Sequence, residues 1–204
     1  MTQRIDDPRL RLTFDRLPHY VKAWQRWADH PDVVRALIFL EVKLTDADHF
    51  RGCLARVDLK QLGIPEQCAF SRDLDAFVFV AYGVLDALSQ IVAEVAEVQT
   101  TREIKFPLIA RILAEDRRQP ERWDRFRHWI EQVYRLPWYI EVRRLRNVIN
   151  YGSVLSAPLH WPPEAHCVSQ WLASYDRVIE TAEQGLALLL EPDVETPSRR
   201  ERWR

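Results

Sequence analysis

The stretch RRLRNVINYGS, residues 143–153, gathers the side chains of this sequence that are best suited to chemistry on a phosphate group. Its three guanidinium groups can bind phosphate or carboxylate through paired hydrogen bonds. Its two amides and its phenol add further hydrogen-bond donors and acceptors. The residues are Arg143, Arg144, Arg146, Asn147, Asn150 and Tyr151. Such a run either forms a binding site or ends an ordinary helix with a solvated, charged face.

A helix over residues 138–151 is expected to position this run. Its apolar residues recur at i, i+4, i+7 and i+11, which predicts one core-facing stripe. They are Trp138, Val142, Leu145 and Ile149. Arg146 flanks the stripe, Asn147 and Tyr151 share the opposite side, and Gly152 stands where a glycine commonly ends a helix. The alternative interpretation is that these cations only stabilise an ordinary helix end. Each cation in the last turns of a helix interacts favourably with the helix dipole, by about 0.3–1 kcal/mol.

From Trp138 to Gly152 the sequence reads W-Y-x-x-x-R-x-L-R-N-V-I-N-Y-G, which resembles the signature of the HEPN superfamily (higher eukaryotes and prokaryotes nucleotide-binding). The upstream segment FVFVAYGVLDALSQIVAEV resembles the long helix of that family, which often carries an acidic residue in its apolar face, here Asp86. The resemblance covers about residues 70–155. It implies an all-α, usually dimeric protein with an R-N-x-x-x-H motif near the end of a long helix.

The resemblance also implies roles for individual residues. In active members the arginine and the histidine act together at a dimer cleft and cut RNA without a metal ion. Arg146 and Asn147 match the R-N pair, whereas the histidine position falls on Tyr151. Tyrosine has a reference pKa of about 10 and is a poor base at pH 7, but it can donate a hydrogen bond or stack on a base. We therefore expect a degenerate or altered ribonuclease site, in which Asn150 and Arg143 support the three motif residues.

Asp86 needs a partner if it is buried, because an unpaired buried carboxylate is costly. One hypothesis is that Asp86 holds Arg146 and fixes its aim. The alternative is that Asp86 lies on a narrow solvent-exposed strip of its helix, near Gln90.

Two other segments carry functional residue types. Residues 159–167 collect metal-ligand types at a spacing that matches no familiar site, so no metal is expected there, although His160 could replace the missing histidine. Residues 120–134 interleave arginines with aromatic residues, which could clamp RNA. The helical spacing of its apolar residues favours core packing instead; they are Trp123, Phe126, Ile130 and Val133.

The rest of the chain predicts an all-α, HEPN-like bundle in one domain over residues 1–190, followed by a flexible tail over 191–204. Prolines separate the helical patterns, and only five glycines are present, which argues against a turn-rich β fold. The expected helices are 14–29, 32–58 with Asp32 as N-cap, 72–98, 104–114, 120–135, 138–151 and 164–190. The helix over 72–98 is apolar almost all round, Phe79 included, and is expected to be central and buried.

Composition restricts the setting of the protein. The net charge of −1 gives no overall attraction to nucleic acid, so any such binding needs a local patch. Three scattered cysteines, a charged N-terminus and no apolar run as long as a bilayer span predict a cytoplasmic protein without membrane contact. No phosphate loop or other cofactor motif is present, so no cofactor is expected.

Two functions fit the sequence. The first is a HEPN-like, RNA-targeting protein of toxin or defence type that forms a homodimer. Its partners are then RNA and an antitoxin or other protein. The alternative is a non-catalytic helical module for dimerisation or protein interaction, in which Tyr151 packs instead of reacting.

Overall fold

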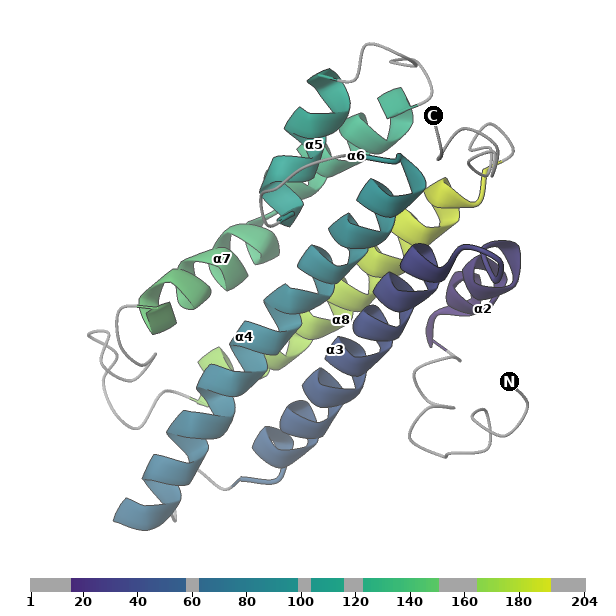
Figure 1. Cartoon of the computed structure of the whole chain (residues 1–204). Helices are drawn as coiled ribbons and strands as arrows, with labels where there is room; N and C mark the ends of the chain where they lie inside the picture. Colours follow the sequence, from purple (N-terminus) through teal and green to yellow (C-terminus); the bar gives the residue numbers. More distant parts are fainter. Residues whose placement is uncertain (1–15, 58–62, 99–103, 116–122, 151–164, 192–204) are drawn as a thin grey trace.

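The computed structural model describes residues 16–57, 63–98, 104–115, 123–150 and 165–191. These residues form seven helices and no strand, which confirms the predicted all-α bundle (Figure 1). The helices are α2 (Pro18–Arg26), α3 (Pro31–Ala55), α4 (Ile64–Val95), α5 (Phe106–Glu115), α6 (Asp124–Tyr134), α7 (Pro137–Asn150) and α8 (Ala165–Leu189).

Prolines mark the beginnings of several helices. A proline occupies one of the first two positions of α2, α3 and α4, and Pro137 begins α7. These positions need no backbone N–H donor, and proline already has the helical φ angle. Two sequence expectations are corrected. The N-cap of α3 is His30, with Asp32 in the first turn. Helix α4 begins at Ile64 instead of the predicted residue 72. The prediction began too late because most side chains of the first two turns are exposed and give no apolar stripe.

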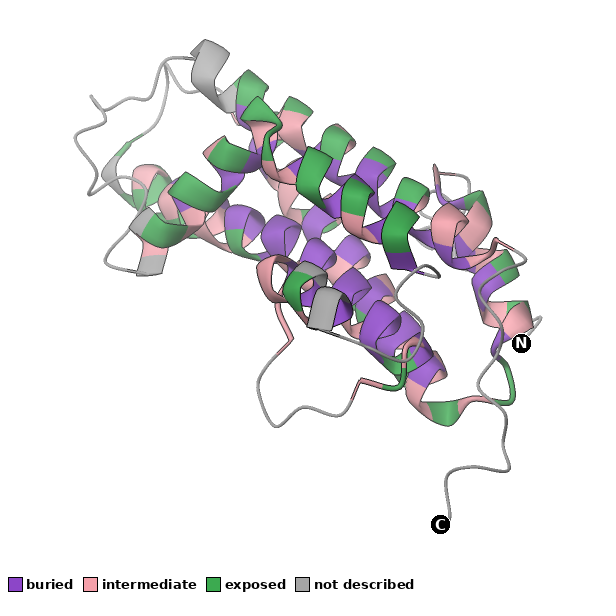
Figure 2. Cartoon of the chain, turned by 90° about the horizontal axis from the view of Figure 1, so that it is seen from above, coloured by how far each residue is buried: buried purple, intermediate pink, exposed green. Residues whose placement is uncertain are grey.

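Helix α4 lies at the centre of the bundle, as predicted. It contacts α3, α5, α7 and α8, and in Figure 1 it lies between α3 and α7. Its inner positions, such as Leu85, Leu88 and Ile91, have no exposed surface. Figure 2 shows buried residues on the faces that the helices turn toward each other and exposed residues on the outer faces. Burial of this apolar surface is the main source of stability in such a bundle.

Length and composition would allow one described helix, Pro65–Val95 within α4, to cross a membrane. Polar residues such as Asp86 and Gln90 interrupt the apolar run of this helix, so no membrane span was predicted from it. In the structure 72% of its most apolar window is buried inside the bundle. A central core helix has the same composition as a membrane span, so this feature is weak evidence for a membrane.

Helix α2 is fastened along α8 by polar contacts. The backbone and ring nitrogens of His19 contact the carboxylate of Glu183. At the end of α2, Arg26 Nη1 donates a hydrogen bond at 2.7 Å to the carbonyl of Leu190, the residue that follows α8. The first residue of the predicted tail, Glu191, forms an ion pair with Arg125 at 2.9 Å. The remainder of that tail, 192–204, lies outside the described residues.

Candidate nucleic-acid-binding site

Helix α7 carries three of the predicted site residues, Arg143, Arg146 and Asn147, with side chains that are at least partly exposed. Its inner side packs on α4 and α8 through Val142 and Leu145, which are both buried as expected. Arg143 and Asn147, one turn apart, are exposed, while Arg146 is half-buried at the junction with α4. The helix ends at Asn150, whose side chain is outside the described part of the structure. Tyr151 and His160 also lie outside the described residues, so their predicted roles stay predictions.

The guanidinium group of Arg146 lies against two aromatic rings of α4. Its Cζ is 4.4 Å from the ring centroid of Tyr82 and 5.9 Å from that of Phe79. Both distances are within the range of cation–π attraction. Among the described residues, no carboxylate lies at ion-pair distance from Arg146. The guanidinium N–H groups are therefore free of an acidic partner in this part of the chain, while the aromatic rings hold the group in place.

Arg144, two positions away, has a different environment. Its Nε and Nη2 each donate to the carboxylate of Glu141 at 2.8 Å. The hydrogen bond from Arg144 holds the pKa of Glu141 below its ordinary value, against the effect of burial, and the Trp171 side chain adds a weaker hydrogen bond. The same pairing raises the pKa of Arg144. Arg144 therefore has its charge satisfied within the helix and is a matched control for Arg146.

Tyr82 packs in a cluster with a second buried tyrosine, Tyr139, and with the partly buried Tyr134. The hydroxyl oxygens of Tyr82 and Tyr139 are 3.4 Å apart, and the ring of Tyr134 meets that of Tyr139 edge-on at 5.2 Å. Burial raises the pKa of Tyr82 and of Tyr139 and raises the pKa of Tyr134 to about 12. These phenols are neutral at pH 7 and are not candidates for a general base. They form a packed aromatic support beneath Arg146.

Asp86 lies one turn beyond Tyr82 on α4, where α5 begins. Its Oδ1 accepts a hydrogen bond from the backbone N–H of Phe106, the first residue of α5, at 2.9 Å. Asp86 thus caps α5 from another helix, a role in which carboxylates stabilise helix N-termini. The expected contact between Asp86 and Arg146 is absent among the described residues. Arg146 contacts the ring of Tyr82, which lies one turn before Asp86 on α4. The charge of Asp86 raises the pKa of Tyr82, and the charge of Arg146 lowers it.

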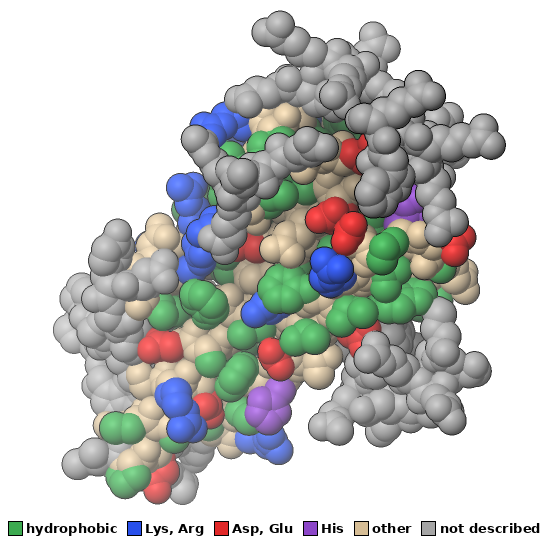
Figure 3. Space-filling view, viewed as in Figure 1, with side chains coloured by type: hydrophobic (Ala, Val, Ile, Leu, Met, Phe, Trp, Pro, Cys, Tyr) green, Lys and Arg blue, Asp and Glu red, His purple; other side chains and the backbone are tan. Residues whose placement is uncertain are grey.

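Exposed apolar residues occur on α7, on α4 against which it packs, and on α3. Phe79 on α4 is 47% exposed, which corrects the expectation that it is buried, and Ile140 on α7 is 55% exposed. On α3, Val42 is 48% exposed and Phe39 is 37% exposed. Figure 3 shows hydrophobic side chains on the face formed by α3, α4 and α7, with Lys and Arg as well as Asp and Glu side chains between them. We call the group Phe79, Ile140, Arg143, Arg146 and Asn147 the α4–α7 face.

Sequence reasoning missed two important residues of this region. Tyr139 has no exposed surface and joins α7 to Tyr82, yet the apolar stripe was assigned through its neighbour Trp138, which is only partly buried. The available signal was the spacing of Tyr139, Val142 and Leu145, which is also i, i+3 and i+6. Phe79 was read as core because α4 is apolar on nearly every side, so periodicity alone could not tell its outward side.

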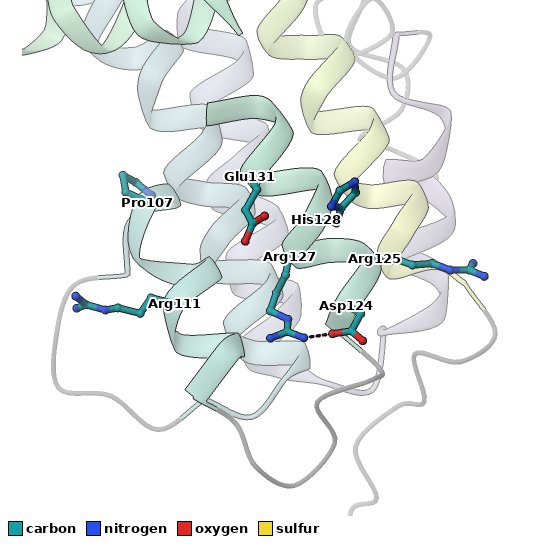
Figure 4. Close-up of a pocket in the computed structure, with 7 residues that line it drawn as sticks. All are labelled: Pro107, Arg111, Asp124, Arg125, Arg127, His128 and Glu131. Carbon is teal, nitrogen blue, oxygen red and sulfur yellow. Dashed lines mark ion pairs between the residues drawn. The ribbon is translucent and has the colours of Figure 1, made fainter. Parts of the chain in front are cut away.

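A separate open cleft lies between α5 and α6 (Figure 4). It is lined by Pro107, Arg111, Asp124, Arg125, Arg127, His128 and Glu131. Arg127 is paired with Asp124 within the cleft, and Arg125 is paired with Glu191. These acidic partners neutralise much of the positive charge of the cleft, so it is a weaker anion site than the α4–α7 face. Trp123, which precedes α6, and the α6 residues Phe126, Ile130 and Val133 are buried, which confirms the core stripe predicted for 120–134.

The chain matches no protein-family model, and no curated protein or solved structure is significantly similar to it. A function for the chain is therefore inferred from the geometry of the α4–α7 face and from the residues that α7 carries there.

Proposed function

We propose that this chain is a HEPN-like, RNA-targeting protein of toxin or defence type whose ribonuclease site is degenerate or altered. The observation that carries the proposal is the position of Arg146. Its guanidinium group is held on two aromatic rings and has no acidic partner among the described residues, as a phosphate-binding arginine requires. The exposed amide of Asn147 and the exposed cation of Arg143 lie beside it on the same helix.

The roles of the residues follow from their chemistry. Arg146 binds a phosphate and stabilises the charge that develops on it during cleavage. Asn147 orients the phosphate through its amide, and Arg143 adds a second cation for the neighbouring phosphate. Tyr151, at the position of the family's histidine, donates or positions a proton, because a phenol with a pKa near 10 is not an effective base at pH 7.

The test is RNA binding and cleavage with EDTA present, across a series of salt concentrations. We expect the unchanged chain to bind a mixed RNA pool in a salt-dependent manner, since phosphate binding releases counterions. Arg146→Ala should lower the affinity about tenfold or more and should reduce the salt dependence by about one phosphate contact. Arg144→Ala is the control and should bind nearly as the unchanged chain does, because Arg144 is paired with Glu141.

The outcomes separate an active site from a degenerate one. Cleavage that Arg146→Ala abolishes would make the protein a metal-independent ribonuclease with Tyr151 as an altered catalytic residue. Binding without cleavage would make it an RNA-binding protein with a degenerate site. An unchanged chain that binds no RNA at 50 mM salt would overturn the proposal.

The second candidate is a non-catalytic module that forms a homodimer or binds an antitoxin or other protein. It is favoured by the exposure of three large apolar side chains, Phe79 on α4, Ile140 on α7 and Val42 on α3, because exposed apolar surface can form a protein contact. Ile140→Asp should then weaken self-association about tenfold or more, as measured by analytical ultracentrifugation. An unchanged chain that is monomeric at high concentration would argue against self-association.

A further inference from the structure

Phe79 occupies an unusual position for a large aromatic residue. It belongs to the central helix, whose other large side chains are mostly buried, yet 47% of it is exposed. Its ring also lies 5.9 Å from the guanidinium carbon of Arg146, the group assigned to phosphate binding. An exposed ring beside such a cation matches the two parts of a nucleotide, a flat base and an anionic phosphate.

We infer that Phe79 is a base-stacking residue that selects unpaired nucleotides, with the base on its ring and the adjoining phosphate at Arg146. The inference rests on the proposed RNA-targeting function and adds the class of RNA. Bases in a duplex are stacked on each other and cannot reach a side chain on a flat helical face, whereas the bases of single strands can. Phenylalanine stacks on any base, so little sequence preference is expected from this contact.

The neighbouring helix repeats the arrangement. On α3, Phe39 is 37% exposed and the ammonium nitrogen of Lys43 lies 5.1 Å from its ring centroid. The Lys43 side chain also lies against α4 at Gly83, where an added Cβ would be 3.3 Å from the Lys43 Cδ. Two exposed aromatic rings, each with its own cation, thus occur on adjacent helices. This pairing of ring and cation favours a nucleic-acid strand over an apolar protein surface as the occupant.

The experiment measures the affinity of the full chain for three fluorescent probes of equal length. They are a single-stranded RNA, the same strand with abasic nucleotides at its centre, and the matching duplex. We expect the single strand to bind best. Phe79→Leu should lower its affinity about 5- to 150-fold, the range of one base–aromatic stack, without changing the salt dependence. Phe79→Trp should retain the affinity, and Phe79→Leu should cause no further loss with the abasic strand.

The controls distinguish this inference from the function on which it rests. Arg146→Ala should weaken all three probes, because it removes a phosphate contact that they share. Equal binding of single strand and duplex, unchanged by Phe79→Leu, would overturn base stacking and leave the proposed function standing. A Phe79→Leu protein that loses self-association but keeps its RNA affinity would overturn it as well, in favour of a protein contact. Failure of the unchanged chain to bind any probe would overturn both proposals.

Discussion

Phe106→Ala is expected to lower the free energy of unfolding by about 3–5 kcal/mol, the usual cost of replacing a fully buried phenylalanine. Phe106 begins α5, has no exposed surface, and lies 5.7–6.0 Å from the rings of Trp129, Tyr134 and Tyr139. One side chain therefore joins α5, α6 and α7. The alanine variant loses both the buried area and three aromatic contacts. Urea unfolding followed by far-ultraviolet circular dichroism measures the loss.

The matched control for this prediction is Phe79→Ala. The same side chain is removed, but from a position that is 47% exposed. We expect a loss of about 1 kcal/mol or less, because little water-excluded area disappears and the cation–π contact with Arg146 is weak at an exposed site. Equal losses for the two variants would contradict the assignment of Phe106 as the junction of three helices. The same comparison shows whether Phe79 variants are folded well enough for the RNA measurements.

Gly185→Ala is expected to destabilise the protein by about 1–3 kcal/mol, although alanine is the better helix former. Gly185 lies in α8, where an added Cβ would be 2.6 Å from Leu88 Cδ2 on α4 and 2.8 Å from the Trp129 ring on α6. Both neighbours are buried, so neither can move into solvent to make room. Thermal unfolding should show a melting temperature several degrees lower.

Gly83→Ala is the control for this second prediction. It makes the same change in the middle of α4, but the nearest atom to the added Cβ is Lys43 Cδ at 3.3 Å, on a side chain that can shift toward solvent. We expect a neutral or stabilising effect of up to about 1 kcal/mol, the difference in helix propensity between the two residues. A Gly185→Ala protein as stable as Gly83→Ala would show that α4, α6 and α8 do not pack as closely as described.

The helical content and much of the core could be predicted because both depend on periodicity along one helix. Apolar residues at helical spacing placed Val142 and Leu145 inside, and the prolines gave several helix starts. The predicted start of α4 was wrong because the first turns of this helix are mostly exposed and therefore carry no periodic pattern of apolar residues. The exposure of Phe79 was missed because an almost wholly apolar helix does not reveal which side lacks a neighbour.

The sequence by itself determined an all-α bundle around a central helix, and it placed Arg143, Arg146 and Asn147 along one side of the helix that carries the motif. These properties follow from residue spacing within a single helix. Only the tertiary structure decided that Arg146 rests on Tyr82 and Phe79 and that Asp86 caps α5 instead of holding Arg146. Those partners lie 20 or more residues apart in the chain, and their meeting depends on how the helices pack. Periodicity within one helix gives the direction of a side chain but not the neighbour that it meets there.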